Sequence, residues 1–321
     1  MNSEPKILVV IISTGEEPFT SMEQGQKDTW IADDGPVRTI WFEGNGRLTN
    51  RRFVKAAGAL MGWVQKAQYG SPRRYTIGKI LPNPLPRKNN SFGAAGRDFL
   101  SRGWTISISW SVVFEWLYRH GNLFSGLIWG LLRIGTSKKV TFFGDRARCE
   151  FPVHWFLLTP ISFLKYQFVS KTFDFDYVLF TTATCYIRPA QLAKNLSNAS
   201  RTRFYGGQVL SLLGHPFVSG NSVILSPDVL RSVLARKKYY RLDIPDDVAL
   251  GRLIRDFDLA EASDLPSVIL PLDATIPDDL KPGWESSHLI RCKTQQVSRD
   301  SSSVVERMRE VHTYLKSSID R

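Results

Sequence analysis

The apolar positions of this chain fall into short continuous runs that alternate with longer amphipathic stretches. Residues 6–13 (KILVVIIS) and 177–180 (YVLF) are unbroken apolar runs of strand length, whereas 155–171 places apolar side chains at helical spacing. A strand that is buried on both faces, as in a parallel sheet, shows an unbroken run of this kind. The alternation predicts an α/β domain whose mixed, mostly parallel sheet carries helices on both faces.

Further elements follow from the same pattern. We expect strands at 37–44 and 140–145, a short helix within 14–31, and helices near 53–68 and 301–318. Four apolar residues of the last helix form one stripe: Val304, Met308, Val311 and Leu315. This stripe predicts a terminal helix that packs against the rest of the domain.

Residues 70–139 interrupt the alternation. The connector 70–96 is rich in Pro, Gly and Asn and is too irregular for a core element. The aromatic-rich block 104–134 holds four tryptophans, and a charged stretch divides it into halves shorter than the ~20 residues that span a bilayer. It is predicted either as helices buried in the core or in an oligomer interface, or as a hairpin lying in a membrane interface. We treat 1–321 as one domain with 70–139 inserted.

The charge of the chain indicates the class of ligand. The sequence has 321 residues, 43% of them hydrophobic, and a formal net charge of +12 with a pI near 9.7. Such a charge attracts phosphate in nucleotides, in nucleic acids or on an anionic membrane. The sequence has no recognisable helix-turn-helix, RNA-binding signature or zinc finger, so nucleic-acid binding is disfavoured.

The cysteines and the first residues suggest a compartment. Cys149, Cys185 and Cys292 are widely spaced without a CxxC pair, which argues against a disulfide framework and a zinc site. The apolar run 7–12 is too short, and too soon followed by Glu16, for a signal peptide or anchor. We therefore expect a reducing, cytoplasmic environment.

Two segments carry candidate chemistry. Thr182 and Thr184 follow the 177–180 strand, at the end where open α/β sheets bind ligands, although hydroxyl residues there equally form an ST-turn. Asp246 and Asp247 precede a helical stretch. A carboxylate in this place suits a general base. Alternatively, Asp246 is the N-cap of the helix and Asp247 interacts favourably with its dipole.

Several segments in order carry a family resemblance. They are the first strand, 25–30 (GQKDTW), 174–192, 216–230, 244–254 and 286–293 (SSHLIRCK). This order resembles the fringe and β-1,3-galactosyltransferase-like glycosyltransferases, which adopt the GT-A fold, a Rossmann-like α/β architecture, and use nucleotide sugars. The resemblance covers about forty N-terminal residues and most of 150–310, and it skips the insert.

The resemblance implies a role for each matching residue. Asp247, with Asp246 as the second choice, would be the base that deprotonates the acceptor hydroxyl. Donor contacts are implied for Thr14, Lys27, Thr182, Thr184, Arg188, His288, Arg291 and Lys293. Acceptor contacts are implied for Gly220 and Asn221, although a glycine beside a strand equally marks a bulge.

The metal motif of the family is degenerate in this chain. In the family an acidic triplet, the DxD motif, follows the equivalent of the 177–180 strand and holds Mn²⁺ or Mg²⁺; here 182–184 reads Thr-Ala-Thr. Hard cations need oxygen ligands, preferably carboxylates. Asp174 and Asp176 lie before the strand, about 20 Å from its carboxyl end. We therefore assign no metal ligand, leave a need for Mn²⁺ or Mg²⁺ open, and expect Arg and Lys to stabilise the departing diphosphate.

The function expected from these residues is sugar transfer from a nucleotide-sugar donor to a hydroxyl of a glycan or lipid-linked acceptor, with inversion. The protein would act on the cytoplasmic side of a membrane, with peripheral contact through 104–134. The alternative is a non-catalytic relative that binds a glycan or a partner enzyme.

Overall fold

A computed structural model describes ten segments of the chain. These are residues 4–15, 17–32, 35–44, 140–149, 158–212, 214–241, 244–271, 276, 284–293 and 301–319. The helix predicted near 53–68 and the insert 70–139 lie outside the described residues.

An eight-stranded sheet lies at the centre of the described part, in the order β11-β7-β10-β5-β1-β2-β4-β3. Its strands are β1 (Ile7–Ser13), β2 (Val37–Gly44), β3 (Val140–Phe143), β4 (Arg146–Cys149), β5 (Tyr177–Thr182), β7 (Phe204–Gly207), β10 (Val223–Leu225) and β11 (Glu261–Asp264). β1 is parallel to β2 and β5, β2 to β4, and β7 to β11. β10 is antiparallel to β5 and β7, and β3 is antiparallel to β4. The predicted mixed, mostly parallel sheet is confirmed.

Two smaller sheets complete the strands. One has the order β12-β13-β6, formed by Ser267–Pro271, Leu289–Lys293 and Cys185–Ile187. The other pairs β8 (Val209–Leu212) with β9 (His215–Val218).

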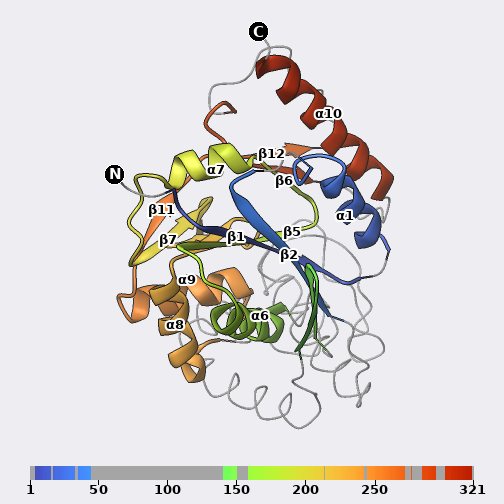
Figure 1. The fold of residues 1–321 in the computed structure, drawn as a ribbon. Helices are drawn as coiled ribbons and strands as arrows, with labels where there is room; N and C mark the ends of the chain where they lie inside the picture. The colour runs from blue at the N-terminus through green and yellow to red at the C-terminus, as the bar shows by residue number, and fades with distance from the viewer. Residues whose placement is uncertain are drawn as a thin grey trace, which may run out of the picture.

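Helices cover both faces of the central sheet, as predicted (Figure 1). α1 (Phe19–Lys27), α7 (Pro189–Leu196) and α10 (Ser301–Ile319) lie on one face. α6 (Leu158–Thr172), α8 (Pro227–Ala235) and α9 (Asp246–Asp256) lie on the other, and a short 3₁₀ turn, η3 (Lys237–Tyr239), follows α8. None of the helices in these segments is both long and apolar enough to cross a bilayer.

The unbroken apolar runs contribute side chains to two separate hydrophobic cores, one on each face of the central sheet. In β1, Val9 packs in the core beneath α1 and α10, whereas Val10 packs in the core that α6, α8 and α9 cover. Leu179 and Phe180 of β5 divide in the same way. Successive strand residues point to opposite faces, so a sheet covered on both sides needs apolar residues at every position.

The terminal helix is confirmed, whereas the strand predicted at 140–145 is shorter than predicted. The four stripe residues of α10 are all buried: Val304, Met308, Val311 and Leu315. The strand predicted at 140–145 ends at Phe143, because Gly144 adopts a positive φ of 59° and turns the chain back into β4. β4 was not predicted, since Arg-Ala-Arg-Cys offers no apolar run.

Candidate functional site

Several strands end together at one edge of the central sheet. Thr182 of β5 is in register with Ile12 of β1, and Ser13 of β1 is in register with Glu43 of β2. Because β10 is antiparallel to β5, the turn 219–222 that precedes β10 lies at the same edge. This carboxyl edge is where open α/β sheets bind ligands.

The residues at the end of β5 are tied to that turn. Thr181 Oγ1 donates a hydrogen bond to the carbonyl of Asn221 at 2.8 Å, and the hydroxyls of Thr182 and Thr184 are 3.0 Å apart. Arg291 of β13 is in register with Cys185 of β6, which places it beside Thr184. The structure therefore brings Thr182, Thr184, Asn221 and Arg291 together; we call these four residues the β5–β6 corner.

Asp247 lies next to this corner. Its Oδ2 accepts a hydrogen bond from the Gly220 amide at 3.1 Å, and its Oδ1 accepts one from the Val248 amide at 2.9 Å. Loss of hydration and the charge of Asp246 raise the pKa of Asp247 to about 7, although the backbone hydrogen bonds oppose the shift. The side chain keeps partial contact with solvent. A carboxylate with a pKa near neutrality suits a general base.

The neighbouring carboxylate, Asp246, turns in another direction. Its Oδ2 accepts a hydrogen bond from Ser162 Oγ of α6 at 3.0 Å, and its carbonyl accepts one from the Tyr240 hydroxyl at 2.8 Å. α9 begins at Asp246 itself, and the N-cap position is Pro245. The alternative in which Asp246 is the N-cap is therefore wrong. Asp247 does lie in the first turn of the helix.

Lys165 is a buried cation that the sequence did not reveal. Its side chain on α6 is 2% exposed, and its Nζ lies 4.5 Å from the centroid of the Phe180 ring. Burial lowers the pKa of Lys165 to about 8, and the charge of Asp246 opposes the shift. A single lysine within the apolar run SFLKYQF was the available signal. Ser162 and Lys165 of α6 thus both interact with Asp246, the first residue of α9.

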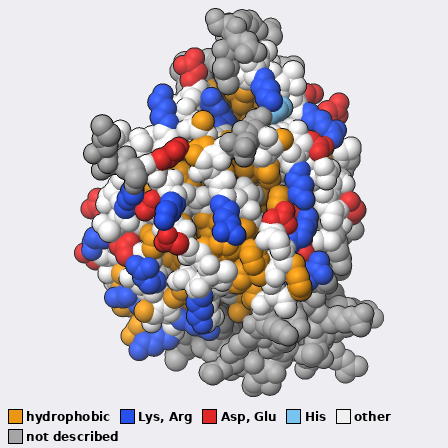
Figure 2. Space-filling model, viewed as in Figure 1, with side chains coloured by type: hydrophobic (Ala, Val, Ile, Leu, Met, Phe, Trp, Pro, Cys, Tyr) orange, Lys and Arg blue, Asp and Glu red, His pale blue; other side chains and the backbone are white. Residues whose placement is uncertain are grey.

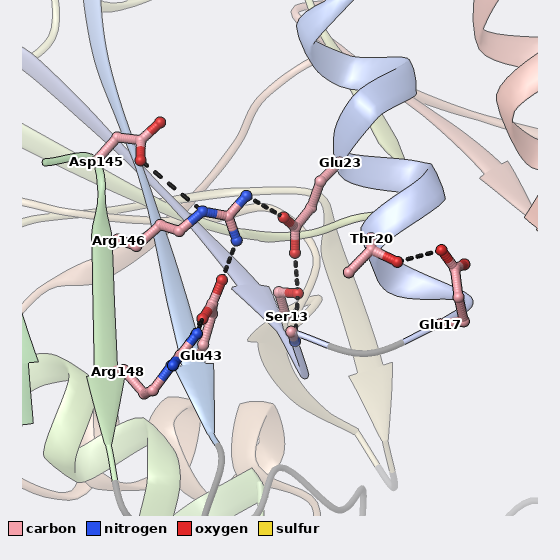
Figure 3. A network of polar contacts seen from close by, with 9 residues as sticks. Ser13, Glu17, Thr20, Glu23, Glu43, Asp145, Arg146 and Arg148 are labelled. Carbon is pink, nitrogen blue, oxygen red and sulfur yellow. Dashed lines mark hydrogen bonds and ion pairs between the residues drawn. The ribbon is translucent and has the colours of Figure 1, made fainter. Parts of the chain in front are cut away.

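A second cluster lies at the ends of β1 and β2 (Figure 3). Arg146 pairs with Glu43 and, at 2.8 Å, with Glu23, while Arg148 contacts Glu43 at 3.0 Å. Ser13 donates a hydrogen bond to Glu23. Both glutamates are buried, and the two arginines balance their charge. Because its members come from four separate elements, this cluster could not be seen in the sequence.

Thr14 and Lys27 lie on the same side of the carboxyl edge as the Glu23–Glu43 cluster. Thr14 follows β1 directly and is partly exposed. Lys27 ends α1, with its Nζ 4.8 Å from the centroid of the Trp41 ring. Arg146 lies 5.5 Å from the same centroid. Neither Thr14 nor Lys27 belongs to the β5–β6 corner.

Arg188 and His288 lie at the other end of the β6–β13 ladder from Arg291. The Arg188 guanidinium donates hydrogen bonds to three backbone carbonyls within 284–287, which ties that turn to β6. His288 is fully buried, and burial lowers its pKa to about 4. The structure does not bring these two residues to the corner. Lys293 ends β13 two residues after Arg291, and its side chain lies outside the described atoms.

The residues at the end of β5 do not fit a divalent cation. Within the segments that the structure describes, no three His, Cys, Asp or Glu side chains come together. Thr182 and Thr184 offer only neutral hydroxyls. Asp176 lies at the start of β5, as predicted, where it accepts a hydrogen bond from the Lys6 amide and pairs with Arg201 at 3.3 Å.

The positive charge of the chain is concentrated in one stretch. Residues 45–139 contain 16 of the 42 Lys and Arg but only 2 of the 30 Asp and Glu, so the rest has 26 basic and 28 acidic residues. Figure 2 shows basic and acidic side chains interspersed on the visible face of the described part. The chain outside 45–139 is therefore close to neutral, and the visible face of the described part carries no broad basic surface.

The described residues define an α/β domain with a carboxylate of raised pKa beside a corner of threonine, asparagine and arginine. In comparisons with known proteins, no family model matches this chain and no curated protein is significantly similar to it. The residues of the carboxyl edge are therefore the basis for a function.

Proposed function

We propose that the protein is a GT-A-like glycosyltransferase, which moves a sugar from a nucleotide-sugar donor to the hydroxyl of a glycan or lipid-linked acceptor. The observation that carries the proposal is Asp247. It lies at the carboxyl edge, partly open to solvent, and its pKa is raised to about 7. Its contact with solvent would let an acceptor hydroxyl approach it, and the Gly220 amide holds the carboxylate in place.

In this reaction Asp247 accepts the proton of the acceptor hydroxyl while the acceptor oxygen bonds to the anomeric carbon. The bond from that carbon to the donor diphosphate breaks on the opposite face, the diphosphate takes the electron pair, and the sugar is inverted. The amides of Gly220 and Val248 orient the carboxylate. With a pKa of about 7, Asp247 is substantially ionised at neutral pH and still basic enough to accept a proton.

Cationic side chains would stabilise the departing diphosphate. Arg291 is the best-placed candidate, because it contacts Asn221 and lies beside Thr184. Arginine recognises phosphate through charge-assisted hydrogen bonds. Since the corner does not fit a divalent cation, no step of the reaction is assigned to a metal. Peripheral contact with the cytoplasmic face of a membrane through 104–134 remains part of the proposal.

A second candidate function is a non-catalytic protein that binds a glycan or a partner enzyme. One observation favours it: the end of β5 carries Thr182, Ala183 and Thr184, where the resembling enzymes have acidic residues. In this case the carboxyl edge would keep affinity for a sugar ligand without turnover.

Nucleotide release from UDP, GDP, dTDP and CMP sugars, with candidate acceptors present, tests the proposal. The purified protein is assayed with Mn²⁺ and again with EDTA, beside Asp247→Asn. Release that persists in EDTA and is lost in Asp247→Asn supports a metal-independent transferase. Release only with Mn²⁺ would mean that ligands lie elsewhere in the chain. No release under any condition, with glycan binding retained, would favour the non-catalytic protein.

A further inference from the structure

Two hydrogen-bond donors at the β5–β6 corner have no acceptor. Asn221 Nδ2 and Arg291 Nε are buried, and neither has a hydrogen-bond partner among the described residues. The Asn221 side chain is 96% buried, since the residue is 4% exposed. Buried donors without acceptors are rare and cost free energy in the folded protein. A ligand that supplies acceptor atoms would recover that free energy.

The surrounding contacts hold the two donors in place. Asn221 Oδ1 accepts hydrogen bonds from Ser219 Oγ at 2.5 Å and from Arg291 Nη1 at 3.3 Å. These bonds occupy the amide oxygen and leave the amide nitrogen as the unused end of Asn221. The side chains of Asn221 and Arg291 are thus joined before any ligand arrives.

The composition of the corner selects an anion. Its side chains offer the hydroxyls of Thr182 and Thr184, the Asn221 amide and the Arg291 guanidinium, all of which can donate hydrogen bonds. The carboxylate of Asp247 lies beside the corner, where it accepts a hydrogen bond from the amide of Gly220, the residue before Asn221. A cation would meet a guanidinium here, whereas a phosphate would meet several donors and one fixed positive charge.

We propose that Asn221 Nδ2 and Arg291 Nε form a metal-independent binding site for the diphosphate of the donor. This assignment rests on the proposed function and moves Asn221 from the acceptor side to the donor side. Because Gly220 holds the base and Asn221 holds the diphosphate, two consecutive residues of one turn fix the positions of both reacting groups.

Binding of pyrophosphate tests the site without requiring turnover. Isothermal titration calorimetry in EDTA measures pyrophosphate, inorganic phosphate and UDP or GDP against the wild-type chain, Asn221→Asp and Arg291→Met. Asn221→Asp keeps the acceptor for Ser219 and Arg291 but places a negative charge where the free amide was. Lys194→Met on α7 is the control, because it lowers the net charge by the same amount far from the corner.

We expect pyrophosphate and a nucleoside diphosphate to bind, with Kd raised at least about tenfold in Asn221→Asp and Arg291→Met and unchanged in Lys194→Met. Thermal unfolding of Asn221→Asp at or above the wild-type midpoint would show that the fold is intact. Unchanged pyrophosphate affinity in folded Asn221→Asp would overturn the site, as would a wild-type chain that binds inorganic phosphate but no diphosphate.

The outcomes separate this site from the proposed function. Diphosphate binding that depends on Asn221, without release of nucleotide from any sugar donor, would keep the anion site and remove the transferase. Turnover that persists in Asn221→Asp with an unchanged KM for the donor would keep the transferase and remove the site.

Discussion

At the scale of the residue, two adjacent aspartates acquire different properties from their surroundings. Asp246 is held by Ser162 and lies near the buried Lys165, whereas Asp247 is held by the Gly220 amide at the carboxyl edge. Consecutive residues in the first turn of a helix point about 100° apart, so one side chain faces α6 while the other faces the turn 219–222. The base is therefore assigned by orientation, since the two residue types are identical.

Replacing Asp247 by Asn should lower kcat/KM for sugar transfer by about 10²- to 10⁴-fold, because the base is lost while the shape of the side chain is kept. Asp246→Asn is the matched control, and the change should stay within about tenfold, since an amide oxygen still accepts the Ser162 hydrogen bond. Transfer assays at saturating donor and varied acceptor give both values.

The pH dependence of the wild-type enzyme gives a second readout of the same prediction. The kcat/KM should rise with pH through a pKa near 7, because only ionised Asp247 accepts a proton. A rate that shows no inflection between pH 5 and pH 8, or an Asp246→Asn variant as inactive as Asp247→Asn, would contradict the assignment of Asp247 as the base.

At the scale of the element, α9 can pack closely on β9 because Gly251 has no side chain. A Cβ added to Gly251 would lie 2.7 Å from Phe217 Cβ, 3.1 Å from Phe217 Cα and 3.2 Å from the Tyr205 hydroxyl. The helix therefore packs directly on β9. Asp247 lies one turn before Gly251 on the same helix. The contact between Gly251 and Phe217 therefore also fixes the position of Asp247 at the carboxyl edge.

Replacing Gly251 by Ala should destabilise the protein by about 1–3 kcal/mol from overpacking, reduced by the ~1 kcal/mol that alanine gains over glycine in a helix. It should also lower kcat/KM, because α9 must shift away from β9 and carry Asp247 with it. Denaturant unfolding and transfer assays measure the two effects.

The control for this prediction is Gly25→Ala, the same change in α1, where the new Cβ would lie 3.1 Å from a Val305 side-chain carbon of α10. Any loss of stability in Gly25→Ala should leave kcat/KM of the folded protein unchanged. Equal activity in Gly251→Ala and the wild type would show that the α9–β9 contact does not position the base.

Most of the described elements follow from local patterns, and the exceptions have physical reasons. β1, β2 and β5 were predicted from short apolar segments of strand length, and α10 from apolar residues at helical spacing. β4 was missed because its pairing with β2 and β3, and not its composition, makes it a strand. Propensity and periodicity describe a segment alone, whereas a short polar strand forms only when neighbours supply the hydrogen bonds.

At the scale of the whole molecule, Asp247 and His288 give the stability opposite dependences on pH. The raised pKa of Asp247 means that the native state keeps a proton between pH 4 and 7 that the unfolded chain loses, so stability falls as pH rises. The lowered pKa of His288 means that the unfolded chain binds a proton between pH 4 and 6.5 that the native state lacks, so stability rises with pH.

Replacing either residue should therefore change how the free energy of unfolding depends on pH. Between pH 4 and 7 the free energy of unfolding of Asp247→Asn should increase relative to wild type, by at most about 4 kcal/mol, because one pKa unit corresponds to about 1.4 kcal/mol. For His288→Asn the difference from wild type should become less favourable as pH rises from 4 to 6.5. Urea titrations at several pH values measure both differences, and slopes of the same sign would contradict this account.

The amino-acid order was sufficient for the α/β class, for the burial of both sheet faces and for most of the main elements, because apolar patterning is a local property of the chain. It also pointed to Asp247, Asn221 and Arg291 as separate candidates. Their meeting at one edge, and the exclusion of Arg188 and His288 from it, came from strand pairing between segments that are far apart in the sequence, such as Arg291 with Cys185. Burial, charge and orphaned donors are properties of that assembled environment, which no single segment carries by itself.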